Sequence, residues 1–207
     1  MQQADRKQKK VSARRGAYHH GDLRASLVEA TRQLVEEKGP DRFSVSDACR
    51  LAGVSTAAPY RHFSDREEML FAVTMDGMDR FYEVMRDAVE GLPRGSAEAI
   101  FALGRAYVDF AAAEPGVFRL IFGLAQRQGK SDDVRERGMR VYGVLLDQVA
   151  GHYGYDDINQ DVQARAFSLW TFVHGLSFLL IDEKTSQMEI DVNLDEVIGT
   201  ASRRMLA

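Results

Sequence analysis

A short segment between Gly53 and Arg66 concentrates side chains whose types and spacing suit hydrogen bonding to a polyanion. It combines hydroxyl groups, hydrogen-bonding rings and guanidinium groups, namely Ser55, Thr56, Tyr60, Arg61, His62 and Arg66. Such groups donate to phosphate oxygens, and serine and threonine also exchange hydrogen bonds with the edges of bases. The segment therefore predicts contact with nucleic acid.

Catalysis and metal binding need sets of side chains that the sequence does not supply. No nucleophile lies beside a base. The only loose candidate for a catalytic pair, His152 near Tyr153, has a local spacing that fits the end of a helix. His19 and His20 are adjacent and point apart on a helix, without an acidic or cysteine partner at ligand spacing. Cys49 is the single cysteine and is expected to be a buried small hydrophobe. We expect no enzyme, no metal and no cofactor.

Two helices precede the segment. Leucine and alanine at helical spacing predict the first over 22–38, and Gly39 followed by Pro40 ends it. The second starts near Ser44, because Ser44-Val45-Ser46-Asp47 resembles a capping box.

A tight turn joins the second helix to a third, which carries the segment itself. Gly53 permits the turn because glycine adopts backbone conformations closed to other residues. Ser55 or Thr56 caps the third helix, and Pro59 falls near its first turn, where a missing N–H costs little. This order is that of a helix-turn-helix, which places a short helix in the major groove of DNA.

The rest of the chain shows only helical patterns. Ser64-Asp65-Arg66-Glu67 is a strong capping box for a helix that reaches about residue 90. Further helices are expected at 96–114, 117–125, 133–153, 159–182 and 193–205, with an exposed loop over 127–133. We predict an all-α chain of about nine helices in three parts. These are a basic flexible arm at 1–17, a three-helix DNA-binding head at 18–66 and a helical ligand-binding and dimerisation body at 67–207.

Charge is unevenly divided along the chain. Residues 1–66 carry 13 Lys and Arg against 8 Asp and Glu, a net charge of +5, and the remainder carries a net −9. This asymmetry is typical of a basic end that faces nucleic acid and an acidic body. The sequence contains no run of about 18 uncharged apolar residues, the length that would predict a membrane span. With a polar N-terminus and a single cysteine, these features favour the cytoplasm.

Residues 22–70 resemble the N-terminal domain of tetracycline-repressor (TetR) family transcription regulators. The matching residues are Gly53-Val54-Ser55, Tyr60, His62-Phe63, Asp65-Arg66-Glu67 and Leu70. The family pattern usually has lysine where Arg66 stands, so the charge is kept while a planar fork replaces a point charge. The resemblance implies a regulator that binds double-stranded operator DNA.

The resemblance and the side-chain chemistry together assign the DNA contacts. The third helix faces bases with its first residues, where a threonine or alanine methyl can pack on a thymine methyl. Tyr60 and His62 match positions that usually touch phosphate, with packing inside the head as the alternative. Arg61 reaches a base or a phosphate, and Phe63 belongs to the core. The full set is Arg14, Arg15, His20, Ser44, Val45, Ser55, Thr56, Ala57, Tyr60, Arg61, His62 and Arg66.

The stretch from Ala164 to Ile181 is apolar almost all round, and a helix without a polar face must be buried on every side. One chain covers one face, so we expect a second copy to cover the other. The resemblance implies the same, since TetR regulators are usually homodimers joined by their last two helices. The candidate interface residues are Phe167, Val173, Phe178, Ile181, Val197, Ile198 and Ala201.

Aromatic side chains in the body mark a candidate ligand pocket. They are Phe81, Tyr107, Phe110, Phe118, Phe122, Tyr142 and Trp170, with His174 as a polar anchor. Aromatics at helical spacing also form ordinary core, and a lone histidine on an apolar helix is often a satisfied core residue, so both interpretations stay open. The spacing of Trp170 and His174-Gly175, with Glu114-Pro115-Gly116-Val117-Phe118 upstream, resembles the C-terminal domain of one TetR subgroup.

Two functions fit these observations. In the first, the protein is a ligand-responsive repressor whose homodimer leaves a near-palindromic operator when an unknown small apolar ligand binds the body. In the second, the body binds a protein instead, as in a nucleoid-associated or cell-division regulator. A body without an internal cavity favours the second.

Overall fold

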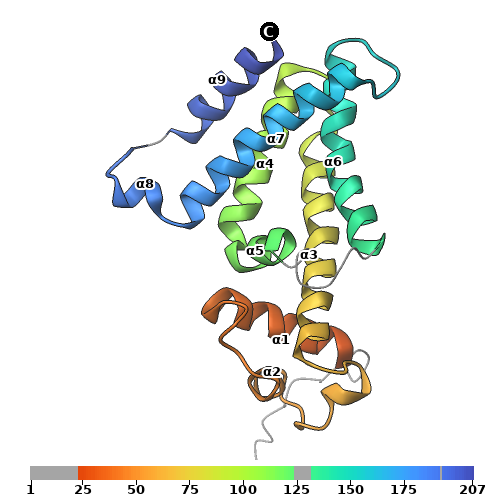
Figure 1. Ribbon diagram of the computed structural model, residues 1–207, viewed down its shortest axis with the longest axis vertical. Helices are drawn as coiled ribbons and strands as arrows, with labels where there is room; N and C mark the ends of the chain where they lie inside the picture. The colour runs from red at the N-terminus through yellow and green to blue at the C-terminus, as the bar shows by residue number, and fades with distance from the viewer. Residues whose placement is uncertain (1–22, 124–131, 192) are drawn as a thin grey trace, which may run out of the picture.

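The computed structural model describes residues 23–123, 132–191 and 193–207, and every regular element in these ranges is a helix (Figure 1). The prediction of an all-α fold is confirmed. The expected arm at 1–17, the candidate DNA contacts Arg14, Arg15 and His20, and most of the loop expected at 127–133 lie outside the described residues.

The first two helices of the head form as the sequence predicts. Helix α1 spans Leu23–Lys38 and helix α2 spans Val45–Ala52. Ser44 caps α2 through a reciprocal pair of hydrogen bonds with Asp47: the Asp47 N–H donates to Ser44 Oγ at 3.1 Å, and the Ser44 N–H donates to the Asp47 carboxylate at 3.0 Å. Gly53 ends α2 in the left-handed region, with φ of 69°.

The third element of the head is not the α-helix that the sequence predicts. It is a single 3-10 turn, η1, over Pro59–Arg61, and neither Ser55 nor Thr56 caps it, because its first flanking residue is Ala58. The cause is Pro59. An α-helix starting at Ser55 needs the N–H of residue 59 to donate to the Ser55 carbonyl, and proline has no N–H. The Ser55 carbonyl instead accepts from the Ala58 N–H at 3.0 Å.

Helix α3, over Arg66–Ala88, leaves the head and runs the length of the body's lower half (Figure 1). Its cap is displaced by one residue from the capping box expected at Ser64. The Asp65 carboxylate accepts from the Glu68 N–H at 2.8 Å, and the Ser64 N–H donates to the Glu68 carboxylate at 2.6 Å. A carboxylate cap makes a stronger, charge-assisted hydrogen bond than a hydroxyl, which favours Asp65.

Six helices complete the body in the ranges that the structure describes. They are α4 Ala97–Ala113, α5 Pro115–Gly123, α6 Asp132–His152, α7 Gln160–Ile181, α8 Lys184–Gln187 and α9 Leu194–Leu206. Only the one-turn α8 has no counterpart among the expected helices. Helix α4 packs on α7, α3 packs on α6, and α9 lies against α4 and α7. One buried apolar cluster runs continuously from Leu27 in the head to Leu206 in α9.

Candidate nucleic-acid interface and ligand cavity

The turn after Gly53 and the short helix η1 expose one contiguous set of polar side chains. All six candidate contacts in this region, Ser55, Thr56, Ala57, Tyr60, Arg61 and His62, are exposed. Tyr60 stands out because 63% of its surface is accessible, which is uncommon for a large aromatic side chain. Pro59 and Phe63 are buried beneath it and fix η1 to the head, as the prediction of a core role for Phe63 requires.

The start of α2 is less open to phosphate than the sequence suggests. The Ser44 N–H donates to Asp47, so it is not free for an incoming anion. These hydrogen bonds from Ser44 lower the pKa of the Asp47 carboxyl, which is therefore ionised and repels phosphate at this helix end. Val45, the next residue along the chain after Ser44, is half-buried.

Arg66 closes the head instead of reaching outward to phosphate. Its guanidinium donates to the carbonyl oxygens of Pro40 and Phe43 and pairs with the Glu67 carboxylate at 2.8 Å. It also lies over the Phe43 ring. Two carbonyls of the loop before α2 and the Glu67 carboxylate of α3 thus engage three of its five N–H groups, and these contacts favour an internal clamp over the expected phosphate contact.

Cys49 is 1% exposed, and burial raises the pKa of its thiol. A buried thiol with a raised pKa is a poor nucleophile. Cys49 is therefore a packing residue, as predicted. Among the described residues no group of three or more His, Cys, Asp or Glu side chains is arranged to hold a metal ion.

A partly open cavity of about 410 Å³ lies in the body between α3, α4, α5, α6 and α7. Of the aromatic candidates, Phe81, Tyr107, Phe122, Tyr142 and Trp170 line it. The sequence missed the aliphatic part of the wall, whose members come mainly from α3 and α6: Met78, Met85, Ile121, Val134, Gly138, Met139, Val141 and Leu145. The seven-residue spacing of Met78 and Met85 was the available signal, since it places both on one face of α3.

Three predicted pocket residues are not part of the cavity wall. Phe110 stacks on Phe81 at 4.5 Å between ring centroids, and Phe118 is fully buried against Phe81 and Tyr107. Both are ordinary core behind the wall, which corrects the prediction. His174 does not line the cavity itself and lies behind three residues that do, Tyr107, Phe122 and Trp170.

Tyr107, Trp170 and His174 satisfy one another at the cavity wall. The Trp170 Nε1–H donates to the Tyr107 hydroxyl at 3.1 Å, and the hydroxyl lies 2.9 Å from His174 Nδ1. Burial lowers the pKa of His174 and raises that of Tyr107, so both are neutral near pH 7. In the tautomer that carries its proton on Nε2, the neutral imidazole accepts a hydrogen bond from the hydroxyl at Nδ1. The cluster therefore leaves the cavity wall almost wholly apolar, and the exposed Arg135 is the only charged residue that lines it in the described part of the chain.

The candidate dimer residues divide into a surface group and a buried group. Phe167 is 57% exposed, and Phe178, Ile181, Val197 and Ala201 are half-buried. Val173 and Ile198 are buried within the chain itself, so they support this face from beneath and cannot touch a partner, which corrects their assignment.

Helix α7 therefore keeps an uncovered apolar side, to which Leu179, at 50% exposed, also belongs. By length and composition alone α7 is apolar enough to cross a membrane, a property that core helices of soluble proteins share.

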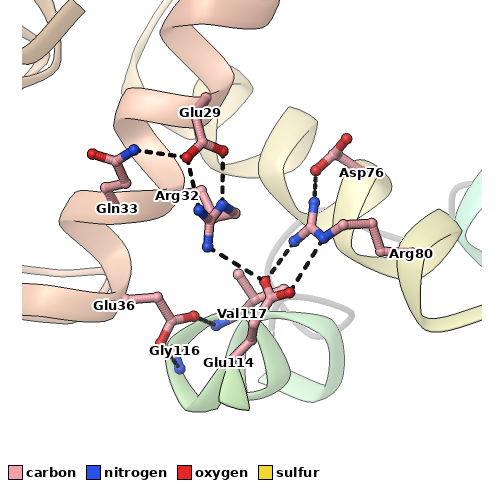
Figure 2. Close-up of polar contacts among 9 residues, drawn as sticks. All are labelled: Glu29, Arg32, Gln33, Glu36, Asp76, Arg80, Glu114, Gly116 and Val117. Atoms are coloured by element: carbon pink, nitrogen blue, oxygen red, sulfur yellow. Dashed lines mark hydrogen bonds and ion pairs between the residues drawn. The ribbon is translucent and has the colours of Figure 1, made fainter. Parts of the chain in front are cut away.

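The head and the body meet at the N-terminus of α5, as Figure 2 shows. The Glu36 carboxylate of α1 accepts hydrogen bonds from the backbone N–H groups of Gly116 at 2.9 Å and Val117 at 2.8 Å. Glu114, directly before α5, accepts from the Arg80 guanidinium of α3 at 2.6 Å and 3.3 Å. The sequence predicted no contact between these residues: Glu114, Gly116 and Val117 entered only through the subgroup resemblance, and single glutamates and arginines in amphipathic helices look like solvated charges.

A helical head that exposes a turn and a short helix, joined to a helical body with an apolar cavity, defines a helix-turn-helix transcription regulator. Two family models match this chain. That of "Bacterial regulatory proteins, tetR family" matches residues 27–73, and "Tetracyclin repressor-like, C-terminal domain" matches residues 100–200. This chain belongs to the TetR family of DNA-binding transcriptional regulators.

Individual relatives agree with the family. An "Uncharacterized HTH-type transcriptional regulator" from Haemophilus influenzae is 27% identical over 133 residues, which are 64% of this chain; the match spans 63% of that relative's length. A solved structure of a protein with unknown function from Rhodococcus sp. RHA1 is 30% identical, with a TM-score of 0.77 over 92% of this chain and 97% of that one.

A TetR-family transcriptional regulator from Streptomyces coelicolor shares the fold, with a TM-score of 0.68 at 14% identity over 88% of this chain and 78% of that one. Because the family and its neighbours are transcriptional regulators, the prediction that the chain is not an enzyme is confirmed.

Proposed function

We propose that this protein is a cytoplasmic repressor whose homodimer binds a near-palindromic operator and is released by a small, uncharged, apolar ligand. The observation that carries the proposal is the closed set of hydrogen bonds around Tyr107 in the wall of the cavity. The cavity has the size and the apolar wall of a small-molecule site. An apolar cavity of this size also supports a small ligand over a protein partner for the body.

The exposed face of η1 supports the DNA half of the proposal. In a two-fold dimer, two such faces enter successive major grooves about one helical turn apart. Thr56 and Ala57 meet base edges, while Tyr60, Arg61 and His62 contact phosphates beside them. The uncovered apolar side of α7 supports the dimer, because a second copy of α7 and α9 buries it.

The cavity wall favours an uncharged ligand. A charged group placed beside Tyr107 loses its hydration without gaining a partner, because the hydroxyl, indole and imidazole groups already pair with one another, and the charged lining residue among those described, Arg135, is exposed to solvent. Ligand in the cavity shifts the protein toward a conformation in which the two heads no longer match the operator.

Operator release by a neutral probe tests the function. Operator fragments are first selected from random DNA with the purified protein. Binding of N-phenyl-1-naphthylamine is then followed by its fluorescence, beside its sulfonated analogue 1-anilinonaphthalene-8-sulfonate, which differs by one buried charge. We expect the neutral probe to bind more tightly and to lower operator affinity by at least about fivefold, the low end of common allosteric couplings. A neutral probe that binds and leaves operator affinity unchanged contradicts the proposal.

Two glycines on α6 supply a matched pair of variants for the cavity. Gly138 lines the cavity, and a Cβ there would sit 3.6 Å from Met78, whereas Gly143 lies outside the wall and has open space around it. We expect Gly138→Leu to fill the cavity and reduce probe binding. Gly143→Leu makes the same change on the same helix and is expected to leave probe binding intact.

A further inference from the structure

The Tyr107 hydroxyl lies between two hydrogen-bonding rings at the wall of the cavity. The Trp170 Nε1–H donates to it at 3.1 Å, and His174 Nδ1 lies 2.9 Å away. These two are its hydrogen-bond partners in the described part of the chain. Because Tyr107 and Trp170 both line the cavity, the direction of the hydroxyl proton is decided beside the space that a ligand enters.

Only one of the two bonds to this hydroxyl can change direction. A phenolic hydroxyl donates one proton and accepts at two lone pairs, and an indole N–H only donates, so Trp170 always occupies one lone pair of the oxygen. An imidazole nitrogen accepts when it carries no proton and donates when it carries one. The direction of the bond between Tyr107 and His174 therefore depends on whether Nδ1 is protonated.

Uncharged rings surround the imidazole of His174. Helix α5 contributes Phe118 and Phe122, whose ring centroids lie 5.8 Å and 4.5 Å from that of His174. Helix α7 itself contributes Trp170 at 5.8 Å and Phe178 at 5.0 Å. Burial among these rings lowers the pKa of His174, so the imidazole is neutral near pH 7 and gains its proton in acid.

The ionisable groups on the neighbouring helices leave His174 as the group that titrates here. Helix α4 presents Tyr107 and α6 presents Tyr142, and burial raises the pKa of both phenols, so neither ionises in acid or near neutrality. Arg135 of α6 lines the cavity but is exposed, and Arg119 of α5 is held in an ion pair beyond the end of α7. Within the described ranges, no ionised side chain pairs with the imidazole.

Protonation of His174 leaves the hydroxyl proton of Tyr107 without an acceptor in the protein. The Nδ1–H and the Trp170 N–H then both donate to the hydroxyl oxygen and occupy its two lone pairs. The hydroxyl proton must point elsewhere, and the cavity that Tyr107 lines is where an acceptor can enter. A carbonyl oxygen on an otherwise apolar molecule is such an acceptor, and it brings no charge to desolvate.

We propose that protonation of His174 reverses its hydrogen bond with Tyr107 and makes the Tyr107 hydroxyl a donor to the carbonyl of an uncharged ligand, such as a ketone or an ester. This ligand class rests on the proposed function of the cavity and adds the condition under which the ligand binds best. Near neutral pH a ligand carbonyl meets the hydroxyl oxygen and loses its own hydration, so a hydrocarbon binds better. By linkage, a bound ketone raises the pKa of His174 and takes up a proton.

Two probes of equal shape separate the carbonyl from the rest of the ligand. In 2-isopropenylnaphthalene a C=CH₂ group replaces the C=O group of 2-acetylnaphthalene. Their dissociation constants are measured by calorimetry on the full-length protein at about pH 7.5 and about pH 5.5, on either side of the ordinary histidine value. We expect the affinity of the ketone relative to the alkene to rise by at least about threefold on acidification, within what one hydrogen bond contributes. At the lower pH, buffers of different ionisation enthalpy should show proton uptake with the ketone and none with the alkene.

Three variants locate the effect. Tyr107→Phe removes the donor, and His174→Asn removes the titrating group. His152→Asn is the control, because it makes the same change at an exposed histidine on α6. We expect the acid preference for the ketone to persist in His152→Asn and to be lost in the other two. An equal relative affinity at both pH values in the wild type overturns the proposal. Persistence of the preference in Tyr107→Phe or His174→Asn, or its loss in His152→Asn, does the same.

Nitrogen NMR of protein labelled with ¹⁵N-histidine tests the reversal without a ligand. The His174 signals are those missing from His174→Asn. We expect Nδ1 to be unprotonated at about pH 7.5 and protonated in acid. A proton on Nδ1 at the higher pH overturns the proposal, because the hydroxyl is then free at both.

Failure of the proposed function is recognised separately. If neither probe binds, the proposed ligand site is wrong and the ligand class falls with it, while the nitrogen signals still decide whether the bond reverses. If the ketone binds as expected and leaves operator affinity unchanged, the ligand class stands and the repressor function is wrong.

Discussion

The guanidinium of Arg66 lies 4.7 Å from the centre of the Phe43 ring and donates its Nε–H to the Phe43 carbonyl oxygen at 3.2 Å. A further donation to the Pro40 carbonyl fixes the loop between α1 and α2 against the start of α3. A lysine at this position offers a point charge without the planar fork that stacks on a ring and bridges two carbonyls. The family's usual lysine is therefore not equivalent to Arg66 in this head.

We expect replacement of Arg66 to change the stability of the fold more than the electrostatic attraction to DNA. Arg66→Ala leaves two carbonyls without their donor and exposes the Phe43 ring, so we expect a loss of about 1–3 kcal/mol in the free energy of unfolding. Urea denaturation measures it.

The salt dependence of operator binding supplies the contrast between Arg66 and Arg61. The exposed Arg61 is expected to contact phosphate in both protomers, so Arg61→Ala should reduce the slope of log affinity against log salt by about 1.8, or about 0.9 for each protomer. Arg66→Ala should change that slope far less. A slope reduced equally by both substitutions would return Arg66 to the phosphate contacts.

Thr56 is expected to read sequence. It is exposed in the turn before η1, where its methyl and hydroxyl groups can both meet base edges. Thr56→Ala should change the base preferred at one position of each half-site, by about 1–3 kcal/mol, while the salt dependence stays the same. Selection from random DNA with both proteins shows this as a change in the consensus. An unchanged consensus would assign Thr56 to phosphate or to no contact.

Periodicity and capping residues were enough to place the long helices, because α1, α3, α4, α6, α7 and α9 each bury apolar side chains, and α3, α4, α7 and α9 begin at a residue whose side chain caps the first turn. These two signals failed at the third helix, where the covalent structure of one proline outweighs helix propensity. The missing N–H of Pro59 replaces the third helix by a 3-10 turn.

The contact of Glu36 with α5 and the clamp at Arg66 could not be predicted for a different reason. The Glu36 carboxylate finds its donors 80 and 81 residues away, and Arg66 donates to carbonyls 23 and 26 residues away. Such pairings depend on tertiary packing, which no local pattern records. The cavity wall could be predicted only in part. Its aromatic residues stood out in the sequence, but its aliphatic residues could not be distinguished from ordinary core.

Phe167 is expected to be central to dimerisation. It is the most exposed apolar side chain on α7, and burial of a large aromatic anchor dominates many interfaces. Phe167→Asp should raise the dimer dissociation constant by about 30-fold or more, the equivalent of about 2 kcal/mol. Sedimentation equilibrium measures it. Leu51→Asp, at a residue 47% exposed in the head, is the control and should leave the dimer intact.

His174 is expected to make the stability of the body depend on pH. Burial lowers its pKa below the ordinary value of 6.5, so the unfolded chain binds the proton more readily than the folded one. Its contribution is fully present above the unfolded pKa and is lost as pH falls toward the folded pKa, by at most about 1.4 kcal/mol per pH unit. Protonation also removes the acceptor for the Tyr107 hydroxyl, 2.9 Å away.

The variant His174→Asn tests this pH dependence, because the amide oxygen keeps an acceptor near Nδ1 and does not titrate. Urea denaturation of both proteins at about pH 7.5 and about pH 5.5 gives the difference that belongs to His174 alone, since the other histidines are common to both. We expect the wild type to lose more stability on acidification than the variant. Equal losses would mean that His174 titrates alike in the folded and unfolded chain, and that its hydrogen bond to Tyr107 does not depend on a neutral imidazole.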